Sequence, residues 1–304
     1  MSAVTLPAAS EPGPGSGPGS GPGPVSVPVR RRRGRPAWLR GPSLVGVVVI
    51  VLWALVAITL PLWSPSDPLE EVGKRLQGPS GSHLMGTDAL GRDVFIRTLW
   101  GARTSLPIAV VVILASVLLG TIVGAAAGFF GGWVDAVLMR LVDVTMAFPP
   151  ILLAMAITAS LGPGIRNALI AMVLVWWPIY ARLLRAQILA VRQRDYVESA
   201  VAIGAPRWLV LRRYLLPMSY TPVLVNATMD FGQVVLLTAS LSFIGLGARP
   251  PSPEWGAMIT EGATSFYQWW IAAAPGIAIL LVVLAFNFVG DALRDSLDVK
   301  EGVR

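Results

Sequence analysis

The sequence of 304 residues is strongly apolar, with 54% hydrophobic residues, only 13% charged residues and a mean hydropathy of +0.66. Because soluble domains carry about 25% charged residues, this composition indicates an all-α membrane protein. The chain has no cysteine and one histidine, His83, which excludes disulfides and cysteine-ligated zinc and argues against a histidine-rich metal site or a Ser-His triad. The net charge of +7 would suit nucleic acid, but the placement of the charges favours an explanation by membrane topology.

The N-terminal segment is rich in glycine, proline and serine up to residue 29 and has almost nothing to bury, which predicts disorder for a tail of residues 1–40. A cluster of arginines precedes the first apolar run and is expected to hold the N-terminus in the cytoplasm. A nucleic-acid patch is the alternative for these arginines, and the adjacent membrane span disfavours it. The apolar run begins too far from the start for a cleavable signal peptide. The cluster consists of Arg30 to Arg33, Arg35 and Arg40.

Six apolar segments each have on the order of the 17–25 residues needed to cross a hydrocarbon core. Pro61 is expected to end the first, and a polar stretch at 64–105 separates it from the second. We therefore predict six transmembrane helices. The spans are Leu44 to Leu60, Leu106 to Phe130, Val144 to Leu161, Asn167 to Val191, Met218 to Leu241 and Trp270 to Val289.

Lysines and arginines are concentrated on one side of these six spans. With the N-terminus inside, most of them fall on the cytoplasmic side, as the positive-inside rule requires. Both termini and the polar stretch between the fourth and fifth spans are then cytoplasmic. The sequence therefore predicts a multi-pass protein of a cell membrane, and its high usage of alanine, glycine, arginine and proline favours a bacterial source.

That polar stretch has the residues of two short helices joined by a corner. Asp195 can cap the first helix, and Glu198 completes a capping box. Gly204 can take the left-handed conformation that ends the helix, and Pro206 suits the first turn of the second. We expect Pro217 to end the second, basic amphipathic helix.

Glu198-Ser199-Ala200, Gly204 and the run 214–217 resemble the EAA loop of ABC-importer permeases, in which a cytoplasmic coupling helix docks in a groove of the ATPase subunit. Ser199 stands where that family usually has alanine, and Tyr214 where it has isoleucine or histidine. An ordinary interfacial amphipathic helix is the alternative. The resemblance implies a coupling role for Glu198, Ser199, Ala200, Ala202, Gly204, Ala205, Arg207, Leu216 and Pro217.

Three further stretches are similar to the dipeptide and oligopeptide permeases of the DppC/OppC type. They are residues 83–106, with His-Leu-Met-Gly-Thr-Asp and Gly-Arg-Asp; residues 242–256, with Ser-Phe-Ile-Gly-Leu-Gly; and residues 290–298, Gly-Asp-Ala-Leu-Arg-Asp-Ser-Leu-Asp. Together with the EAA-like loop, they extend the resemblance over roughly residues 38–300.

This resemblance implies a type I ABC-importer permease fold and a cargo of dipeptides or oligopeptides, although some relatives carry nickel or haem. It also implies three partners in the membrane system: a homologous second permease, ABC ATPase subunits that bind ATP and Mg, and an extracytoplasmic substrate-binding protein. The expected parts of the chain are the tail 1–40, the first helix and outer loop 41–105, the core 106–295 with the coupling loop 194–217, and a cytoplasmic tail 296–304.

The chain lacks a Walker A motif, since its one Gly-Lys pair, Gly73-Lys74, is followed by Arg75 instead of Ser or Thr. We therefore expect no catalytic residue, no metal and no cofactor in this chain. An ion-coupled secondary transporter is the distant alternative, and it would require inverted repeats and several intramembrane carboxylates. An intramembrane enzyme would require a nucleophile–base pair, which we do not find.

Four glycines recur at every fourth position along the second span: Gly120, Gly124, Gly128 and Gly132. Small residues at this spacing allow the backbones of two helices to approach closely. We interpret the stripe as helix packing, with a substrate contact as the alternative.

Three polar residues share one face of the fifth span: Asn226, Asp230 and Gln233. Asp230 is expected near the middle of the membrane, where an ionisable group usually faces a cavity or a partner. The stripe either lines the translocation path or belongs to a buried hydrogen-bond network between helices. The outer run Gly91-Arg92-Asp93 is likewise either a local ion-paired turn or part of the surface that receives the binding protein.

Overall fold

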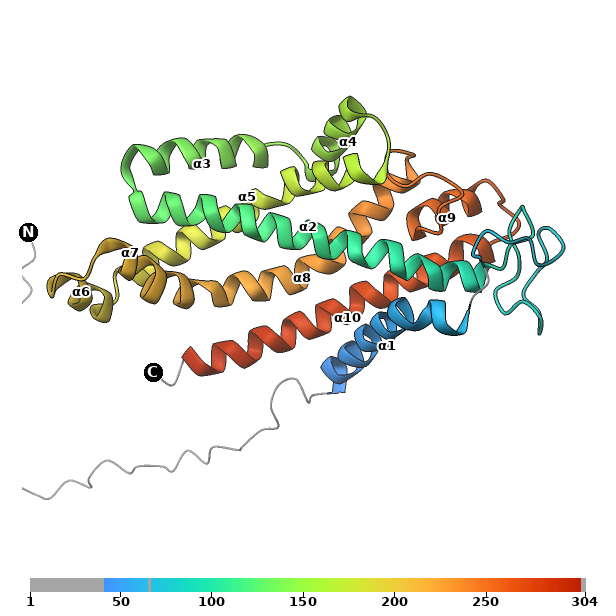
Figure 1. Ribbon diagram of the computed structural model, residues 1–304, viewed down its shortest axis with the longest axis horizontal. Helices are drawn as coiled ribbons and strands as arrows, with labels where there is room; N and C mark the ends of the chain where they lie inside the picture. The colour runs from blue at the N-terminus through green and yellow to red at the C-terminus, as the bar shows by residue number, and fades with distance from the viewer. Residues whose placement is uncertain (1–40, 65–66, 302–304) are drawn as a thin grey trace, which may run out of the picture. The chain divides into compact units, whose positions relative to one another are not determined.

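The computed structural model describes residues 41–64 and 67–301, so the predicted tail 1–40 and its arginine cluster lie outside the described residues. The described part is a bundle of helices with one isolated β-bridge, between Thr87 and Asp93 (Figure 1). In chain order the elements are α1 (Gly41–Trp63), α2 (Val94–Phe130), α3 (Gly132–Met146), α4 (Pro150–Leu161), α5 (Ile165–Arg192), α6 (Asp195–Ala202), α7 (Arg207–Val210), the π-helical turn η2 (Leu211–Leu215), α8 (Leu216–Phe243), α9 (Trp255–Ala263) and α10 (Trp270–Glu301).

Five of these helical segments are each long and apolar enough to cross a membrane. They are α1, α2, α5, the continuous run from Arg207 to Phe243, and α10. The pair α3 and α4 together has the length and composition of one more span, although the two helices are bent by 91°. Counting this pair as one span gives six, the number predicted from the sequence.

The pair α3 and α4 begins at Gly132 and is interrupted before Pro150, so the prediction of one span over 144–161 has the wrong start and misses the bend. The break lies between Met146 and Pro150, where two prolines follow each other. Pro149 holds extended backbone, with φ −56° and ψ 129°, and Pro150 has no N–H to donate. A proline also disfavours helical backbone at the preceding residue, so Phe148 cannot continue α3.

The second span begins earlier than predicted, at Val94 instead of Leu106. Asp93 caps α2, because its carboxylate accepts a hydrogen bond of 3.0 Å from the backbone N–H of Ile96. The helix continues through Pro107, as α1 continues through Pro61 to Trp63. A proline near the end of a predicted span is therefore not a reliable end of a helix in this chain.

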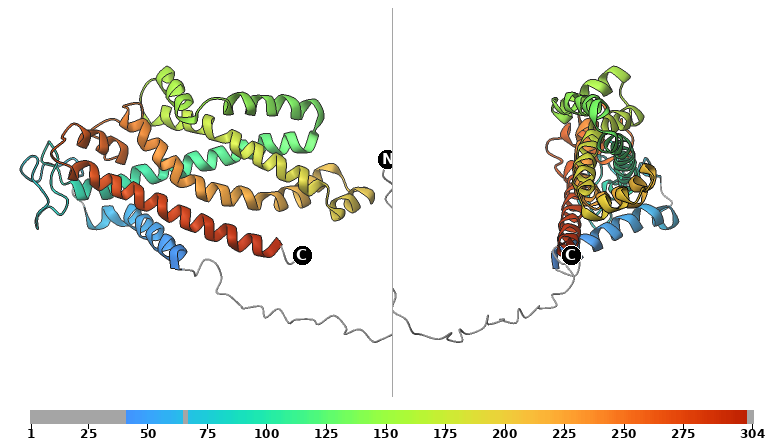
Figure 2. Two further views of the ribbon diagram at one scale, coloured as in Figure 1. Left: turned by 180° about the vertical axis from the view of Figure 1, so that it is seen from behind. Right: turned by 90° about the vertical axis from the view of Figure 1, so that its left-hand side faces the viewer.

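The ends of the bundle are defined by two short helical regions. Figures 1 and 2 show α6 and α7 at one end and α9 at the other, with α2, α5 and α8 running between them. α9 was not predicted. Its Trp255 is fully buried, donates from Nε1 to the Thr98 carbonyl at 2.9 Å, and makes an edge contact with Trp53 at 5.2 Å.

α10 is longer than the sixth predicted span, since it continues past Val289 to Glu301. It runs beside α1 and α8, as both views in Figure 2 show. The helix also continues through residue 295, where we expected the core to give way to a C-terminal tail.

Candidate functional site

The loop that resembles the EAA motif, residues 194–217, is called the coupling segment below. It consists of α6, a turn at 203–206, α7 and the turn η2, and it joins α5 to α8. Gly204 has φ +84°, so the predicted left-handed stop after the first helix is present. Pro206, with φ −64°, precedes α7 as its N-cap residue instead of lying in its first turn.

The predicted capping box is wrong. The N-cap residue of α6 is Arg194, and its side chain makes no capping hydrogen bond. Asp195 and Glu198 instead lie in the first turn of α6. Their negative charges there stabilise the helix, because they are attracted to the partial positive charge of its N-terminus. The Ser199 hydroxyl donates to the Asp195 carbonyl at 2.7 Å, a bond within the helix.

Pro217 does not end a helix, which is a second correction. The chain remains helical from Arg207 to Phe243, and Pro217 lies at the start of α8. In the π-helical turn just before the proline, the Leu216 N–H reaches back five residues to the Leu211 carbonyl. This wider turn accommodates a residue that has no N–H and whose ring would crowd an ordinary α-turn.

One side of the coupling segment is packed against the bundle, and the other is open. The buried side chains are Val197, Ala200, Val210, Leu211 and Leu215. The open side is apolar as well, with Ile203 86% and Trp208 66% exposed. Exposed apolar side chains gathered at one place are typical of a protein or membrane contact.

The residues that the resemblance singles out lie on both sides of the segment. Among them, Ala200 is buried, and Ala205 and Leu216 are half-buried. The remaining ones are exposed: Glu198, Ser199, Ala202, Gly204, Arg207 and Pro217.

The glycine stripe of α2 lies against α5 at three of its four positions. A Cβ atom at Gly120 would collide with Tyr180, one at Gly124 with the Ala181 carbonyl, and one at Gly128 would come within 3.0 Å of Ile188. The glycines therefore allow the backbones of α2 and α5 to lie in close contact, as the prediction of helix packing requires.

Gly132, the fourth position of the stripe, is not part of this contact. It follows the end of α2, has φ +55°, and has no atom within 4 Å of a Cβ position. Gly131, with φ +66°, also has left-handed backbone, and the two glycines reverse the chain between α2 and α3.

Asp230 lies in a hydrogen-bond network between α5 and α8. Its Oδ2 atom accepts from Tyr180 Oη at 2.9 Å, from Trp176 Nε1 at 3.2 Å and from Asn226 Nδ2 at 2.9 Å. Asp230 is buried and Asn226 is half-buried, whereas Gln233 is exposed. The structure thus brings two of the three predicted polar residues together, and it adds an indole and a phenol from α5 that the sequence did not suggest.

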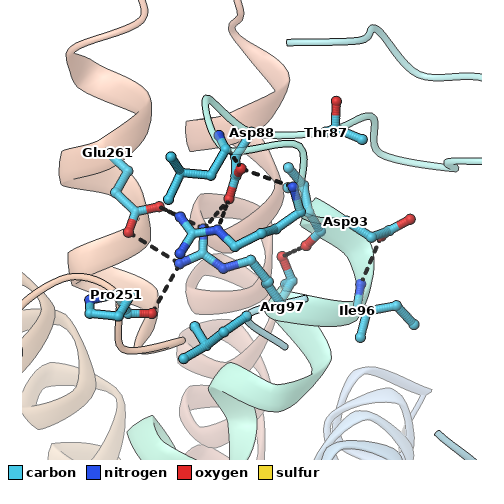
Figure 3. A network of polar contacts seen from close by, with 12 residues as sticks. Thr87, Asp88, Asp93, Ile96, Arg97, Pro251 and Glu261 are labelled. Carbon is cyan, nitrogen blue, oxygen red and sulfur yellow. Dashed lines mark hydrogen bonds and ion pairs between the residues drawn. The ribbon is translucent and has the colours of Figure 1, made fainter. Parts of the chain in front are cut away.

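The outer Gly-Arg-Asp run belongs to a buried network (Figure 3). Asp88 Oδ2 lies 2.6 Å from Arg92 Nε and 2.6 Å from an Arg97 nitrogen. Both arginines also reach Glu261 of α9, at 3.0 Å and 2.6 Å, and Arg97 donates to the Pro251 carbonyl at 3.3 Å. Two guanidinium groups and two carboxylates thus balance in charge and tie the 67–93 loop to α2 and α9.

This network is more than the local turn considered above, because it spans residues far apart in the sequence. Asp88, Arg92 and Arg97 are each less than 5% exposed. A second bond beside it joins His83 Nδ1 to Asp93 Oδ2 at 2.9 Å. Glu261 was missed, since nothing near it in the sequence marks it as the partner of residues 164 positions away.

A buried cap at Glu254 also escaped the sequence analysis. Its carboxylate accepts from the N–H groups of Gly256 and Ala257 at 3.0 and 2.9 Å, and from the Ser105 hydroxyl at 3.3 Å. The signal that was available in the sequence is a carboxylate just ahead of a short apolar stretch, after three prolines at 250, 251 and 253. In the part of the chain that the structure describes, no group of three or more His, Cys, Asp or Glu residues could hold a metal ion.

Comparisons with known proteins match most of the chain to one kind of protein, the membrane components of transport systems. The family model described as "Binding-protein-dependent transport system inner membrane component" matches residues 116–301. The dipeptide transport system permease protein DppC of Alkalihalophilus pseudofirmus is 42% identical over 261 residues, covering 85% of this chain and 86% of that protein. The probable D,D-dipeptide transport system permease protein DdpC of Escherichia coli K12 is 42% identical, covering 86% and 88%.

A glutathione transport system permease protein, GsiD of Pectobacterium atrosepticum, is 41% identical and covers 88% of this chain and 91% of its own length. Among solved structures, the MetNI methionine ABC transporter in inward-facing conformations aligns with a TM-score of 0.54 at 20% identity, covering 67% of this chain and 96% of that chain. An amino acid ABC transporter solved with histidines aligns with a TM-score of 0.51 at 16% identity, covering 68% and 94%. These two likenesses establish the fold of a type I ABC-importer permease. The chain therefore belongs to the family of inner-membrane components of binding-protein-dependent transport systems.

Proposed function

We propose that this chain is the permease subunit of an ATP-binding-cassette importer that carries dipeptides or other short peptides across a bacterial inner membrane. The observation that carries the proposal is the coupling segment, which is fixed to the bundle by a buried side and presents an exposed apolar side. Relatives above 40% identity that are named for dipeptide, D,D-dipeptide and glutathione transport support a cargo of short peptides.

The coupling segment is the proposed contact with a separate ATPase subunit. Ile203 and Trp208 offer apolar area, and Glu198 and Arg207 offer one charge of each sign beside it. Such a mixture of apolar and charged side chains is usual in a protein interface. The buried residues Val210, Leu211 and Leu215 then pass any displacement of the segment on to the bundle, because a close-packed interior does not compress.

The other partners follow from the same function. A second, homologous permease completes the translocation path, and a substrate-binding protein delivers the peptide at the α9 end. Within this path we place the polar face of α8, including Asn226 and the exposed Gln233. ATP and Mg are bound by the ATPase subunits, and both termini of this chain lie in the cytoplasm.

The test is reconstitution of the complete transporter in liposomes, with the neighbouring genes supplying the second permease, the ATPase and the binding protein. We expect uptake of a radiolabelled dipeptide that requires ATP on the coupling-segment side and binding protein on the α9 side. The ATPase rate should rise when the loaded binding protein is added, since a ligand drives the cycle by binding one state more tightly.

Uptake by the purified chain alone, driven by a proton gradient without any ATPase, would replace the proposal with a secondary transporter. If the ATPase is stimulated by a binding protein loaded with nickel or haem, and not by one loaded with peptide, the chain is still an importer permease but its cargo is not a peptide.

A further inference from the structure

A cavity of about 630 Å³ lies beneath the coupling segment, between it and the end of α2. Its volume is within the range of about 300–1,000 Å³ typical of small-molecule sites. The cavity is bounded by Phe129 and Phe130 on one side and by residues of α5, α6, α7 and η2 on the other. The lining residues on that side include Arg192, Glu198, Ala202, Arg207 and Leu215.

The lining of the cavity combines apolar side chains with a net positive charge. The apolar side chains include Phe129, Phe130 and Leu215, and the charged ones are Arg192, Arg207 and Glu198. Neither arginine forms an ion pair with a carboxylate of the described residues. By contrast, Arg182 and Arg185 on the same helix as Arg192 are paired with Asp143 and Asp135 of α3.

Two helices that are long and apolar enough to span a membrane end at the cavity, α2 at Phe130 and α5 at Arg192. The ends of such helices lie at or beyond the boundary between hydrocarbon and water, the region of the lipid phosphates. Basic pockets between transmembrane helices at this boundary bind anionic lipid headgroups.

We propose that this cavity binds an anionic phospholipid, with the phosphate at Arg192 and Arg207 and the upper acyl chains against Phe129 and Phe130. The charges of the lining favour this ligand: two guanidinium groups and the carboxylate of Glu198 leave one net positive charge, which matches the single negative charge of a phosphatidylglycerol headgroup. The bound lipid would fill the space between the coupling segment and α2. The site does not depend on the cargo, but Glu198 and Arg207 also belong to the proposed ATPase contact, so the lipid and the ATPase would compete for them.

The test measures how much phosphatidylglycerol stays with the full-length chain. The chain is purified from nanodiscs of phosphatidylcholine containing phosphatidylglycerol, and the retained lipid is counted by native mass spectrometry and by the immobilised fraction of spin-labelled phosphatidylglycerol. We expect Arg192→Gln to weaken retention about fivefold, since one arginine near an anionic lipid contributes about 1 kcal/mol and 1.4 kcal/mol corresponds to tenfold. Arg192→Gln combined with Arg207→Gln should weaken it further.

Arg212→Gln is the matched control, because Arg212 is an exposed arginine of the same segment that does not line the cavity. It should leave retention unchanged, and a circular dichroism spectrum should confirm that every variant remains helical. Unchanged retention in the double variant, or an equal loss in Arg212→Gln, would overturn the proposal.

The competing occupant is the ATPase subunit, and a cysteine at the cavity wall separates the two. Ala202→Cys can be labelled specifically, because the chain has no other cysteine. We expect phosphatidylglycerol to slow its labelling in the absence of ATPase. If only the ATPase protects this cysteine, the cavity belongs to the protein interface and the lipid proposal is wrong.

Discussion

Asp230 accepts three hydrogen bonds on one oxygen atom, and two of the donors, Trp176 and Tyr180, lie on α5. Replacing it by alanine would leave these buried donors without a partner, at a cost of about 1–3 kcal/mol for each unsatisfied group. We expect Asp230→Ala to lower the thermal unfolding temperature of the purified chain clearly. Asp230→Asn, which keeps an acceptor, should cost about 1 kcal/mol, close to the upper range of such bonds in membrane proteins.

Gln233→Ala is the control for this prediction, because Gln233 shares the polar face of α8 but is exposed. It should leave the unfolding temperature unchanged. Transport measured with the same variants separates the two roles: if Asp230→Asn assembles normally and transports at the wild-type rate, Asp230 only packs helices and does not line the path.

Gly124 lies so close to α5 that a Cβ atom would collide with the Ala181 carbonyl, which is backbone and cannot swing away. We expect Gly124→Ala to destabilise the chain by about 1–3 kcal/mol, as other overpacked interiors do. The measurement is thermal unfolding in detergent, followed by the intrinsic tryptophan fluorescence.

Gly276 provides the comparison, since it is a glycine inside α10 with no atom within 4 Å of its Cβ position. Gly276→Ala should be neutral or stabilising by up to about 1 kcal/mol, because alanine favours helical backbone. Equal destabilisation by both substitutions would mean that close packing against α5 is not what the glycine at 124 provides.

At this scale, periodicity predicted contacts well wherever a helix was straight. Four-residue spacing placed Gly120, Gly124 and Gly128 on one face, and all three lie against α5. The same spacing misplaced Gly132, because α2 ends first and the glycine serves a chain reversal instead. No pattern within α8 could identify Tyr180, since that residue comes from a different helix and only packing brings it to Asp230.

For the coupling segment as an element, Gly204 is the most sensitive position. Its φ of +84° is accessible to glycine and to asparagine but costly for a β-branched residue. We expect Gly204→Val to reorient α6 relative to α7 and to abolish co-purification of the ATPase. Gly204→Asn, of similar size, should retain it.

Space around the residue is not limiting within this chain, because nothing lies within 4 Å of the Cβ position at Gly204. Loss of the ATPase in both variants would therefore point to a steric conflict with the partner and not to the turn. Retention in both would remove the corner from the coupling mechanism.

The buried network at the opposite end fixes α9 and the 67–93 loop to α2. Arg97 is 1% exposed, as Asp88 is, and contacts both Asp88 and Glu261. Removing one partner of a buried ion pair typically costs about 3–5 kcal/mol, because the remaining charge is left without compensation. We expect Arg97→Met to lower the unfolding temperature and to make the 67–93 loop susceptible to limited proteolysis.

A double-mutant cycle with Glu261→Gln tests whether the effect comes from the pair. The two substitutions together should cost less than the sum of the single ones, since they remove opposite charges from one site. Strictly additive costs would contradict a direct interaction between Arg97 and Glu261.

The helices that the sequence predicted well are those that are long, apolar and unbroken. The fourth span, predicted at 167–191, is α5 at 165–192. The third failed because hydropathy does not register a bend, and Pro149-Pro150 was counted inside an apolar run. α9 failed because it has only nine residues, and its stability comes from burying Trp255 rather than from a long periodic pattern.

At the scale of the whole molecule, the decisive prediction is that the coupling segment and α9 face opposite compartments. The absence of native cysteine allows single reporters, and Ile203→Cys and Phe266→Cys place them at exposed positions of the two ends. In intact cells, a membrane-impermeant maleimide should label Phe266→Cys and not Ile203→Cys. After the cells are opened, both should react.

The control is a cysteine in the middle of a span, such as Val112→Cys, which is fully buried and should stay unlabelled in both conditions. Labelling of Ile203→Cys from outside intact cells would invert the topology. The ATPase could not then reach the coupling segment, and the proposed function would be wrong.

The overall class and the order of the spans could be predicted because both depend on hydropathy and segment length, which are properties of the chain itself. The contacts between distant parts of the chain could not be predicted. That Arg92 and Arg97 pair with Glu261, more than 160 positions away in the sequence, depends on how the helices pack, and this packing leaves no local trace in the sequence.

The uninterrupted helix from Arg207 to Phe243 has a mechanical consequence. At 1.5 Å per residue, its 37 residues form a rod about 55 Å long, with the proposed ATPase contact at one tip and the α9 end of the bundle at the other. If the rod pivots near its centre by roughly 6°, each tip moves sideways by about 3 Å, in opposite directions. A push on the inner side would then open the outer side without any bond inside the rod having to break.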